Sequence, residues 1–253
     1  MADASRTVII TGAGSPRGIG RAAARRMARD GWAVALLDLN AGLAAAAAAD
    51  VGTEHGVPAL GIGADVTDEV SVDAAVSAVE KQLPPVRALF NIAGVTSPTR
   101  FLQTTLEEWE RVMRINATGT YIVTKRVAPQ MLEARKGRIV NMSSVSAQRG
   151  GGVFGGVPYS AAKAAILGFT RALAREFGPT GVTVNAVTPG VISTDIREGL
   201  TTPEREASLA ADVPVGRQGT ADEVAALFAF LAGDDASYLT GVTYDINGGS
   251  LIH

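Results

Sequence analysis

The sequence predicts a single α/β domain in which a doubly wound parallel sheet of about seven strands carries helices on both faces. Short runs rich in Val and Ile alternate with longer Ala-, Leu- and Arg-rich segments along all 253 residues. Several of the short runs are apolar on both alternating faces, as strands covered on both sides require. No linker, composition break or internal repeat divides the chain, so we expect residues 1–253 to form one domain.

The expected strands and helices follow one another in strict alternation. The strands are the short β-branched runs Thr7–Thr11, Ala33–Leu37, Ala59–Gly63, Ala88–Ile92, Arg138–Met142, Thr183–Val187 and Val242–Ile246. The helices are the longer segments Ile19–Asp30, Leu43–Glu54, Val70–Gln82, Leu106–Arg135, Tyr159–Phe177 and Ala221–Leu231. We interpret the alanine run at residues 44–49 as ordinary helix, because alanine has the highest helix propensity.

The composition excludes several classes of chemistry. The absence of cysteine excludes disulfides, a thiol nucleophile and thiolate-bound zinc or iron–sulfur clusters. The two histidines, His55 and His253, are too few for a multi-histidine metal centre, and we interpret both as solvated bystanders, so no metal is expected.

The charge balance and the chain's apolar runs bear on partners and location. With 23 basic and 25 acidic residues, the chain has no excess of positive charge to bind nucleic acid. No apolar run approaches the roughly 20 residues of a membrane-spanning helix, and residues 1–11 do not resemble a signal peptide. We therefore expect no nucleic-acid or membrane partner and a cytoplasmic location.

A glycine-rich loop follows the first expected strand and opens the first helix. Residues 11–20 read TGAGSPRGIG. Glycines lack Cβ atoms, so backbone N–H groups at the positive end of the helix can approach a pyrophosphate. The alternative is a tight strand–helix turn that binds nothing. The βαβ context of the loop favours a dinucleotide site.

Asp38 ends the second expected strand, about 20 residues beyond the glycine loop, where a carboxylate can accept hydrogen bonds from a ribose diol. Its side chain can also cap the following helix, and the two interpretations are compatible because a strand-end carboxylate lies near the start of the next helix. A 2′-phosphate at this position would meet a second anion, so we expect NAD rather than NADP as the cofactor. Arg17 is the one residue that could offset this repulsion, and we expect its reach to be insufficient.

Tyr159 and Lys163 are four residues apart, which places both side chains on one face of a helix. A cation beside a phenol stabilises the phenolate and lowers the phenol pKa from about 10, as a general acid/base tyrosine requires. Alone, the pair is also compatible with an ordinary solvent-exposed helix.

Polar residues elsewhere strengthen the catalytic interpretation. The strand Arg138–Met142 ends in Ser143 and Ser144, and ligands of such sheets bind outside the carboxyl ends of the strands. A serine there can donate to a substrate oxygen, or it can satisfy backbone groups at the strand end. Asn116 lies within a long expected helix, where an amide is unfavourable unless its side chain has a role or a local backbone partner.

These motifs, in this order, resemble those of the short-chain dehydrogenase/reductase (SDR) family over essentially the whole chain. The loop departs from the family's TGxxxGxG by two extra residues, which we place at Pro16 and Arg17. Residues 91–94 read NIAG where the family has NNAG, and Asp65-Val66 matches its adenine-flanking pair. The resemblance implies a Rossmann-like fold.

The resemblance also implies roles for individual residues. The expected catalytic residues are Asn116, Ser144, Tyr159 and Lys163. The expected NAD-binding residues are Gly12, Gly14, Arg17, Gly18, Ile19, Asp38, Asp65, Val66, Asn91, Ala93, Gly94, Tyr159, Lys163, Pro189, Ile192 and Thr194. The segment Thr194–Asp212 is expected to form a lid over the substrate.

The implied activity is hydride transfer between NAD(H) and a small secondary alcohol or ketone. We expect a sugar, a polyol or a related hydroxy compound, because the glycine-rich residues 148–156 carry few bulky apolar groups. The alternatives are a 3-oxoacyl-type or hydroxysteroid-type reductase and a non-catalytic dinucleotide sensor. A sugar-nucleotide epimerase would need a further substrate region, and a methyltransferase would not explain Ser144, Tyr159 and Lys163 together.

Two expected helices, Leu106–Arg135 and Tyr159–Phe177, resemble those with which the family pairs its subunits. The second helix carries small or apolar side chains over much of its circumference, and such a helix requires burial on more than one side. The alternative is that other helices of the same subunit cover it. We therefore expect a homo-oligomer, a tetramer rather than a dimer.

Overall fold

The computed structural model of the chain describes residues 4–151, 154–197, 202 and 208–252. Its centre is a seven-stranded parallel sheet with the strand order β3-β2-β1-β4-β5-β6-β9. The strands are β1 (Thr7–Thr11), β2 (Ala33–Asp38), β3 (Ala59–Gly63), β4 (Val86–Asn91), β5 (Gly137–Met142), β6 (Val182–Pro189) and β9 (Thr243–Ile246). The order reverses between β1 and β4, so the predicted doubly wound sheet is confirmed.

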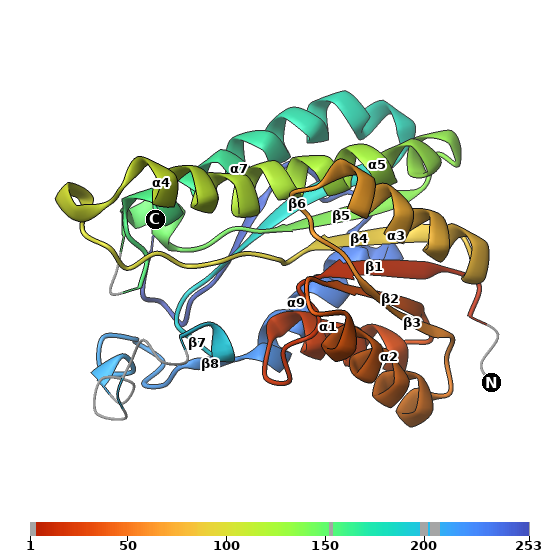
Figure 1. The fold of residues 1–253 in the computed structure, drawn as a ribbon, viewed down its shortest axis with the longest axis horizontal. Helices are drawn as coiled ribbons and strands as arrows, with labels where there is room; N and C mark the ends of the chain where they lie inside the picture. Colours follow the sequence, from red (N-terminus) through yellow and green to blue (C-terminus); the bar gives the residue numbers. More distant parts are fainter. Residues whose placement is uncertain (1–3, 152–153, 198–201, 203–207, 253) are drawn as a thin grey trace.

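Helices cover both faces of this sheet (Figure 1). One apolar layer joins the sheet to α1 (Ile19–Arg29), α2 (Ala41–His55) and α9 (Ala221–Ala232). The other joins it to α3 (Glu69–Gln82), α5 (Gly119–Glu133) and α7 (Val157–Phe177). Because side chains of both strand faces enter these layers, the central strands are apolar on both sides, as the sequence indicated.

The predicted helix Leu106–Arg135 is interrupted in the structure. It consists of α4 (Leu106–Met113), a π-helical turn (Arg114–Thr118) and α5. Within the turn, the buried Asn116 side chain donates from Nδ2 to the carbonyl oxygens of Val112 (2.9 Å) and Val95 (3.0 Å). An amide side chain that takes a backbone acceptor competes with the regular helical hydrogen bonds, which accounts for the wider turn.

Short elements lie at the carboxyl end of the sheet. These are α6 (Ser146–Arg149) and the two-stranded pair of β7 (Ile192–Ser193) with β8 (Gly219–Thr220). The sequence did not predict the pair, because two residues are too few to show a periodic pattern.

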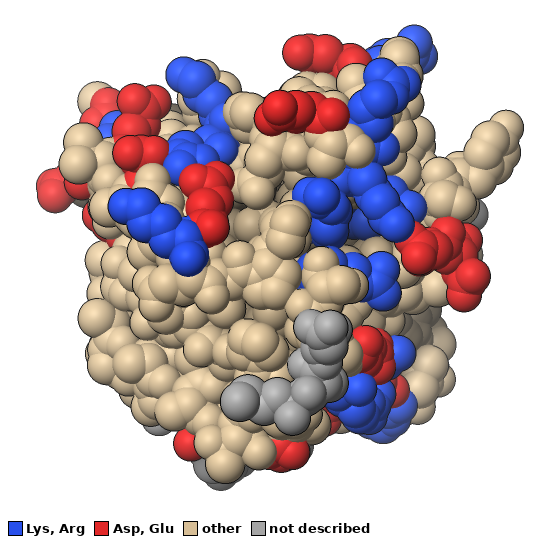
Figure 2. Space-filling model, turned by 90° about the vertical axis from the view of Figure 1, so that its right-hand side faces the viewer, with Lys and Arg blue, Asp and Glu red and all other residues tan. Residues whose placement is uncertain are grey.

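At the amino ends of the strands, basic and acidic side chains are intermixed (Figure 2). Asp234 lies within 4 Å of both Arg6 and Lys136 there. Among the described residues, no helix is both long and apolar enough to cross a membrane. The same residues contain no cluster of three or more His, Asp or Glu side chains suited to a metal ion.

Candidate active site

Two adjoining cavities, of about 340 and 450 Å³, lie at the carboxyl ends of the strands. Gly12, Asp38, Ala93 and Gly94 line both cavities and therefore mark where they join. The first continues to Asn116, Ser144, Tyr159 and Lys163, and the second continues to Asp65 and Val66. The arrangement suits an elongated ligand whose two ends occupy different chambers.

Tyr159 and Lys163 lie one turn apart on α7, as predicted, with the Lys163 Nζ 5.7 Å from the centre of the Tyr159 ring. Lys163 Nζ donates to the carbonyl oxygen of Met142 at 2.9 Å, which ties the ammonium to the end of β5. Ser143 donates its hydroxyl to the Lys163 carbonyl at 2.7 Å and so supports α7. The Ser144 hydroxyl instead accepts from the Ser146 N–H at 3.1 Å and lies close enough to Tyr159 to lower the pKa of that phenol, so Ser144 is the serine beside the phenol.

Burial dominates the electrostatics of this pair. Burial raises the pKa of Tyr159, and the hydrogen bond with Ser144 opposes that shift only in part. Burial also lowers the pKa of Lys163 to about 7. The sequence-based interpretation, in which the lysine lowers the phenol pKa, is therefore incomplete, because burial in the cleft removes hydration from both groups.

Asn116 and Lys163 border a common space beside Gly94. A Cβ atom on Gly94 would lie 2.5 Å from Asn116 Oδ1 and 3.3 Å from Lys163 Nζ, so glycine leaves room there. Asn116 Oδ1 is buried and has no hydrogen-bond partner among the described residues. An unpaired buried acceptor is costly, which favours a polar ligand atom or water in this space.

Asp38 is held by two backbone N–H groups. Its Oδ2 accepts from Gly14 at 2.8 Å, and its Oδ1 accepts from Asn40 at 3.1 Å. The cap of α2 is Asn40, whose side chain accepts from Leu43. The interpretation that Asp38 caps this helix is therefore wrong, and its carboxylate borders both cavities.

The glycine loop fits a dinucleotide. Gly12 has a φ of 67°, and a Cβ there would lie 2.8 Å from the Ala93 backbone. Gly18 is the N-cap of α1 and makes no side-chain cap, which leaves the first N–H groups of the helix available to an anion. A pyrophosphate at this helix end, a ribose at Asp38 and a nicotinamide beside Tyr159 are compatible with the lining of the two cavities.

Comparisons with known proteins agree with this geometry. A family model described as "Enoyl-(Acyl carrier protein) reductase" matches residues 12–250. The chain is 45% identical over 249 residues to the uncharacterized short-chain type dehydrogenase/reductase y4mP of Sinorhizobium fredii, and the match covers 98% of each chain. The chain belongs to the SDR family. This SDR is also 38% identical to 2-(S)-hydroxypropyl-CoM dehydrogenase 3 of Xanthobacter autotrophicus, covering 97% of this chain and 96% of that one.

A solved structure extends the likeness to the fold. The crystal structure of a 3-oxoacyl-[acyl-carrier protein] reductase from Brucella melitensis, solved with bound NAD, matches with a TM-score of 0.88 at 33% identity. The match covers 98% of this SDR and 92% of the Brucella chain. The chain is accordingly an SDR oxidoreductase.

The structure places most of the predicted residues of this SDR around the two cavities. Gly12, Gly18, Ile19, Pro189, Ile192 and Thr194 line the first, together with the catalytic residues. Asn91 lines neither and donates instead to Thr124 Oγ1 (2.9 Å) and Asn141 Oδ1 (2.8 Å) beneath the site. Gly14 also lines neither, and it acts on the site by orienting Asp38.

Some lining residues carry no sequence signal. Met142, Asp195 and Ile196 border the first cavity, and Arg111 and Arg114 border the second. None belongs to a motif, so only the folded chain places them there. In the predicted lid Thr194–Asp212, residues 198–201 and 203–207 lie outside the described residues.

Proposed function

We propose that this SDR transfers a hydride between NAD(H) and a secondary alcohol or ketone. The observation that carries the proposal is the convergence of Ser144, Tyr159 and Lys163 at one end of a cavity whose other end is bordered by Asp38. A non-catalytic dinucleotide sensor is disfavoured, because such a protein would not need Tyr159, Ser144 and Lys163 together in one cavity.

The roles of the side chains follow from their chemistry. A bound nicotinamide would supply the hydride acceptor or donor. In the oxidising direction, the Tyr159 oxygen removes the proton of the substrate hydroxyl, while the Ser144 hydroxyl donates to the same substrate oxygen. The Lys163 ammonium stabilises the phenolate form of Tyr159, and Asn116 supports the polar space beside Lys163.

For the substrate, we propose a hydroxyl or ketone on a short alkyl or acyl chain rather than a sugar or polyol. Besides Ile192, which is assigned to the cofactor, the first cavity presents the apolar side chains of Ile92, Met142 and Ile196. The names of two similar proteins also indicate substrates of this kind. They are a 3-oxoacyl-[acyl-carrier protein] reductase and a 2-(S)-hydroxypropyl-CoM dehydrogenase.

A substrate panel tests the proposed function. Reduction of a 3-oxoacyl thioester, a short methyl ketone and a keto sugar would be followed with NADH and with NADPH. We expect NADH-dependent turnover, with the highest kcat/KM on the thioester or the methyl ketone. Preference for the keto sugar would contradict the substrate proposal, and NADH binding without turnover of any compound would favour the sensor.

We also propose a homo-tetramer, with a second copy of the chain as the partner. Ala117, Thr118, Tyr121, Ala165, Ile166 and Phe169 line a hollow of about 270 Å³ between the α4–α5 segment and α7. Ala165 is exposed and Phe169 is only half-buried within one chain, so described helices of the same subunit do not fully cover this surface. Resemblance to the family favours four subunits over two.

We expect a tetrameric mass by light scattering at micromolar concentration. Phe169→Glu should reduce that mass, because a carboxylate placed in an apolar contact loses its hydration. Exposed Val70 on α3 offers the matched control Val70→Glu, which should leave the mass unchanged. A monomeric wild type would contradict the proposal.

We further propose that residues 1–253 form one domain. We also propose that the protein acts in the cytoplasm. Support for one domain comes from the single seven-stranded sheet, to which segments from β1 to β9 contribute. Support for the location comes from the proposed use of NAD, a metabolite of the cell interior. Fractionation of the native cells, with detection of the enzyme by antibody, tests the location.

A further inference from the structure

The glycine loop of this chain contains a turn that the two extra residues create. The Gly18 N–H donates to the Ser15 carbonyl at 3.1 Å, which closes a turn with Pro16 and Arg17 at its two central positions. Proline favours the first central position of such a turn because its φ is already fixed near the required value. The turn therefore presents the N–H and the side chain of Arg17 in a defined direction.

The N–H and the guanidinium of Arg17, together with the Ser15 hydroxyl, all donate to the carboxylate of Asp195. Asp195 Oδ2 accepts from Ser15 Oγ at 2.6 Å and from the Arg17 N–H at 3.1 Å. Asp195 Oδ1 accepts from Arg17 Nε at 2.5 Å. The Asp195 side chain is 19% exposed, so these bonds are partly shielded from water. Partial burial alone would raise the pKa of Asp195, but the bonds from Ser15 and Arg17 outweigh it and the pKa is lowered.

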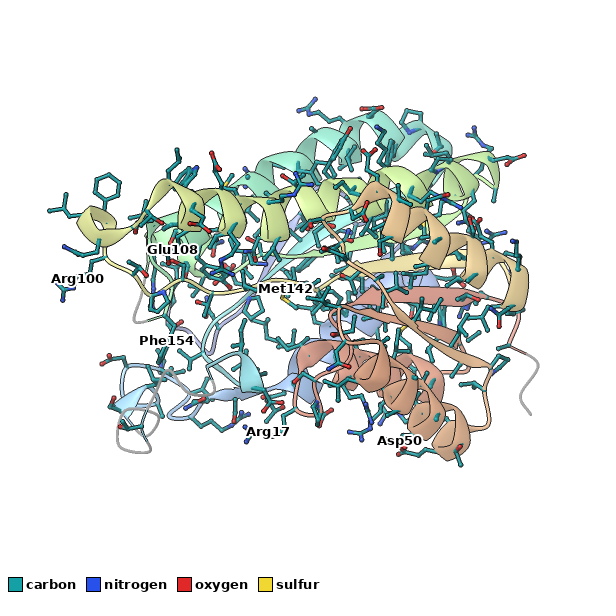
Figure 3. The ribbon with its side chains drawn as sticks, viewed as in Figure 1. Arg17, Asp50, Arg100, Glu108, Met142 and Phe154 are labelled. Atoms are coloured by element: carbon teal, nitrogen blue, oxygen red, sulfur yellow. The ribbon has the colours of Figure 1, made fainter. Side chains whose placement is uncertain are left out.

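The contact lies at the cofactor cavity. Ser15, Gly18 and Ile19 line the first cavity from the α1 side, and Thr194 and Asp195 line it from the segment after β7. Figure 3 shows Arg17 where the start of α1 approaches that segment. Asp195 leaves the first N–H groups of α1 uncapped, so the proposed pyrophosphate position and the contact are compatible.

We propose that Asp195, Arg17 and Ser15 form a latch that joins the two walls of the cofactor cavity and has to open before the dinucleotide leaves. This inference rests on the proposed function and assigns a role to the turn that distinguishes this chain's loop. Asp195 and Arg17 are positioning residues, because they hold the walls and act on the dinucleotide only through them. In this arrangement Arg17 is directed to Asp195 rather than to the ribose at Asp38.

The dissociation rate of NADH from the wild-type chain and from Asp195→Asn tests the latch. It would be measured by stopped-flow fluorescence without substrate. We expect dissociation about tenfold faster from the variant, equivalent to ~1.4 kcal/mol. Asp195→Glu, which keeps the charge, should recover part of the difference. An unchanged rate would contradict the latch, and slower dissociation would show instead that Asp195 competes with the pyrophosphate for Ser15 and Arg17.

A double-mutant cycle separates the contact from unrelated effects of either substitution. Arg17→Ala should also accelerate dissociation, and the double variant should be no faster than the faster single variant. Additive effects would overturn the proposal. Asp73→Asn is the matched control, because Asp73 pairs with Arg126 Nε at the same 2.5 Å distance, between α3 and α5, and lines neither cavity.

Hydrogen exchange without any dinucleotide provides a second readout. Peptides covering the glycine loop should exchange faster in Asp195→Asn than in the wild type, because the uncharged amide has one acceptor oxygen where the carboxylate has two, which weakens the bond from the Arg17 N–H. Unchanged exchange would contradict the contact itself. NADH binding with unaltered dissociation in the variant would contradict the latch alone. A wild type that binds no NADH would contradict the proposed function and the latch together.

Discussion

Replacement of Tyr159 by phenylalanine is expected to lower kcat by about 10²–10⁴-fold, the usual contribution of a general acid/base. The substitution removes one oxygen from a half-buried ring and leaves the packing of that ring on α7 intact, so the fold should persist. NADH affinity should change little, because the substitution leaves Asp38 and the glycine loop, the proposed contacts of the other end of the ligand, unchanged.

Steady-state and single-turnover kinetics on the best ketone of the panel measure this effect, with NADH fluorescence titration as the check on binding. Tyr238→Phe is the matched control, because the same oxygen is removed from a side chain that is 99% exposed. Retention of more than about a tenth of the wild-type kcat, with chemistry shown to be rate-limiting, would remove Tyr159 from the proposed role.

Cofactor choice should depend on Asp38. We expect the wild type to use NAD over NADP by about 100-fold or more in kcat/KM, because like charges in contact cost several kcal/mol and ~1.4 kcal/mol corresponds to tenfold. Arg17 does not offset this repulsion, because its guanidinium binds Asp195. Asp38→Ala should weaken NAD use and raise relative NADP use.

The comparison is made on one substrate with both cofactors. Asp222→Ala, which removes an exposed carboxylate on α9 away from both cavities, should keep the wild-type preference. Comparable use of NADP by the wild type, or an unaltered preference in Asp38→Ala, would show that another group selects the cofactor.

The fold was predictable because the strands of the sheet and the helices that cover it are each indicated by a short-range pattern of residues. Strands with apolar side chains on both faces, such as β2, and the helices between the strands indicate a parallel sheet without any long-range information. Spacing alone also placed Tyr159 and Lys163 on one face of α7. Asp38 was predictable as a strand-end carboxylate, but only the structure shows that Asn40 caps α2 and leaves Asp38 at the cavities.

What the sequence could not predict depends on contacts between distant segments. The pairing of Arg17 with Asp195 joins residues that are 178 positions apart in the sequence and follows no spacing rule. The π-helical turn depends on whether Asn116 finds a carbonyl on another segment, which it does at Val95. The lowered pKa of Lys163 is a consequence of burial, and a residue's burial is set by tertiary packing rather than by its motif.

In the proposed reaction, hydride passes directly between the nicotinamide and a substrate carbon in this cleft. Reduction of the best ketone with NADH deuterated at both C4 positions, followed by mass spectrometry of the alcohol, tests it directly. We expect one deuterium on the new carbinol carbon, and we expect Tyr159→Phe to form that product more slowly by the same factor as its loss of kcat. A carbinol hydrogen derived from solvent would contradict it.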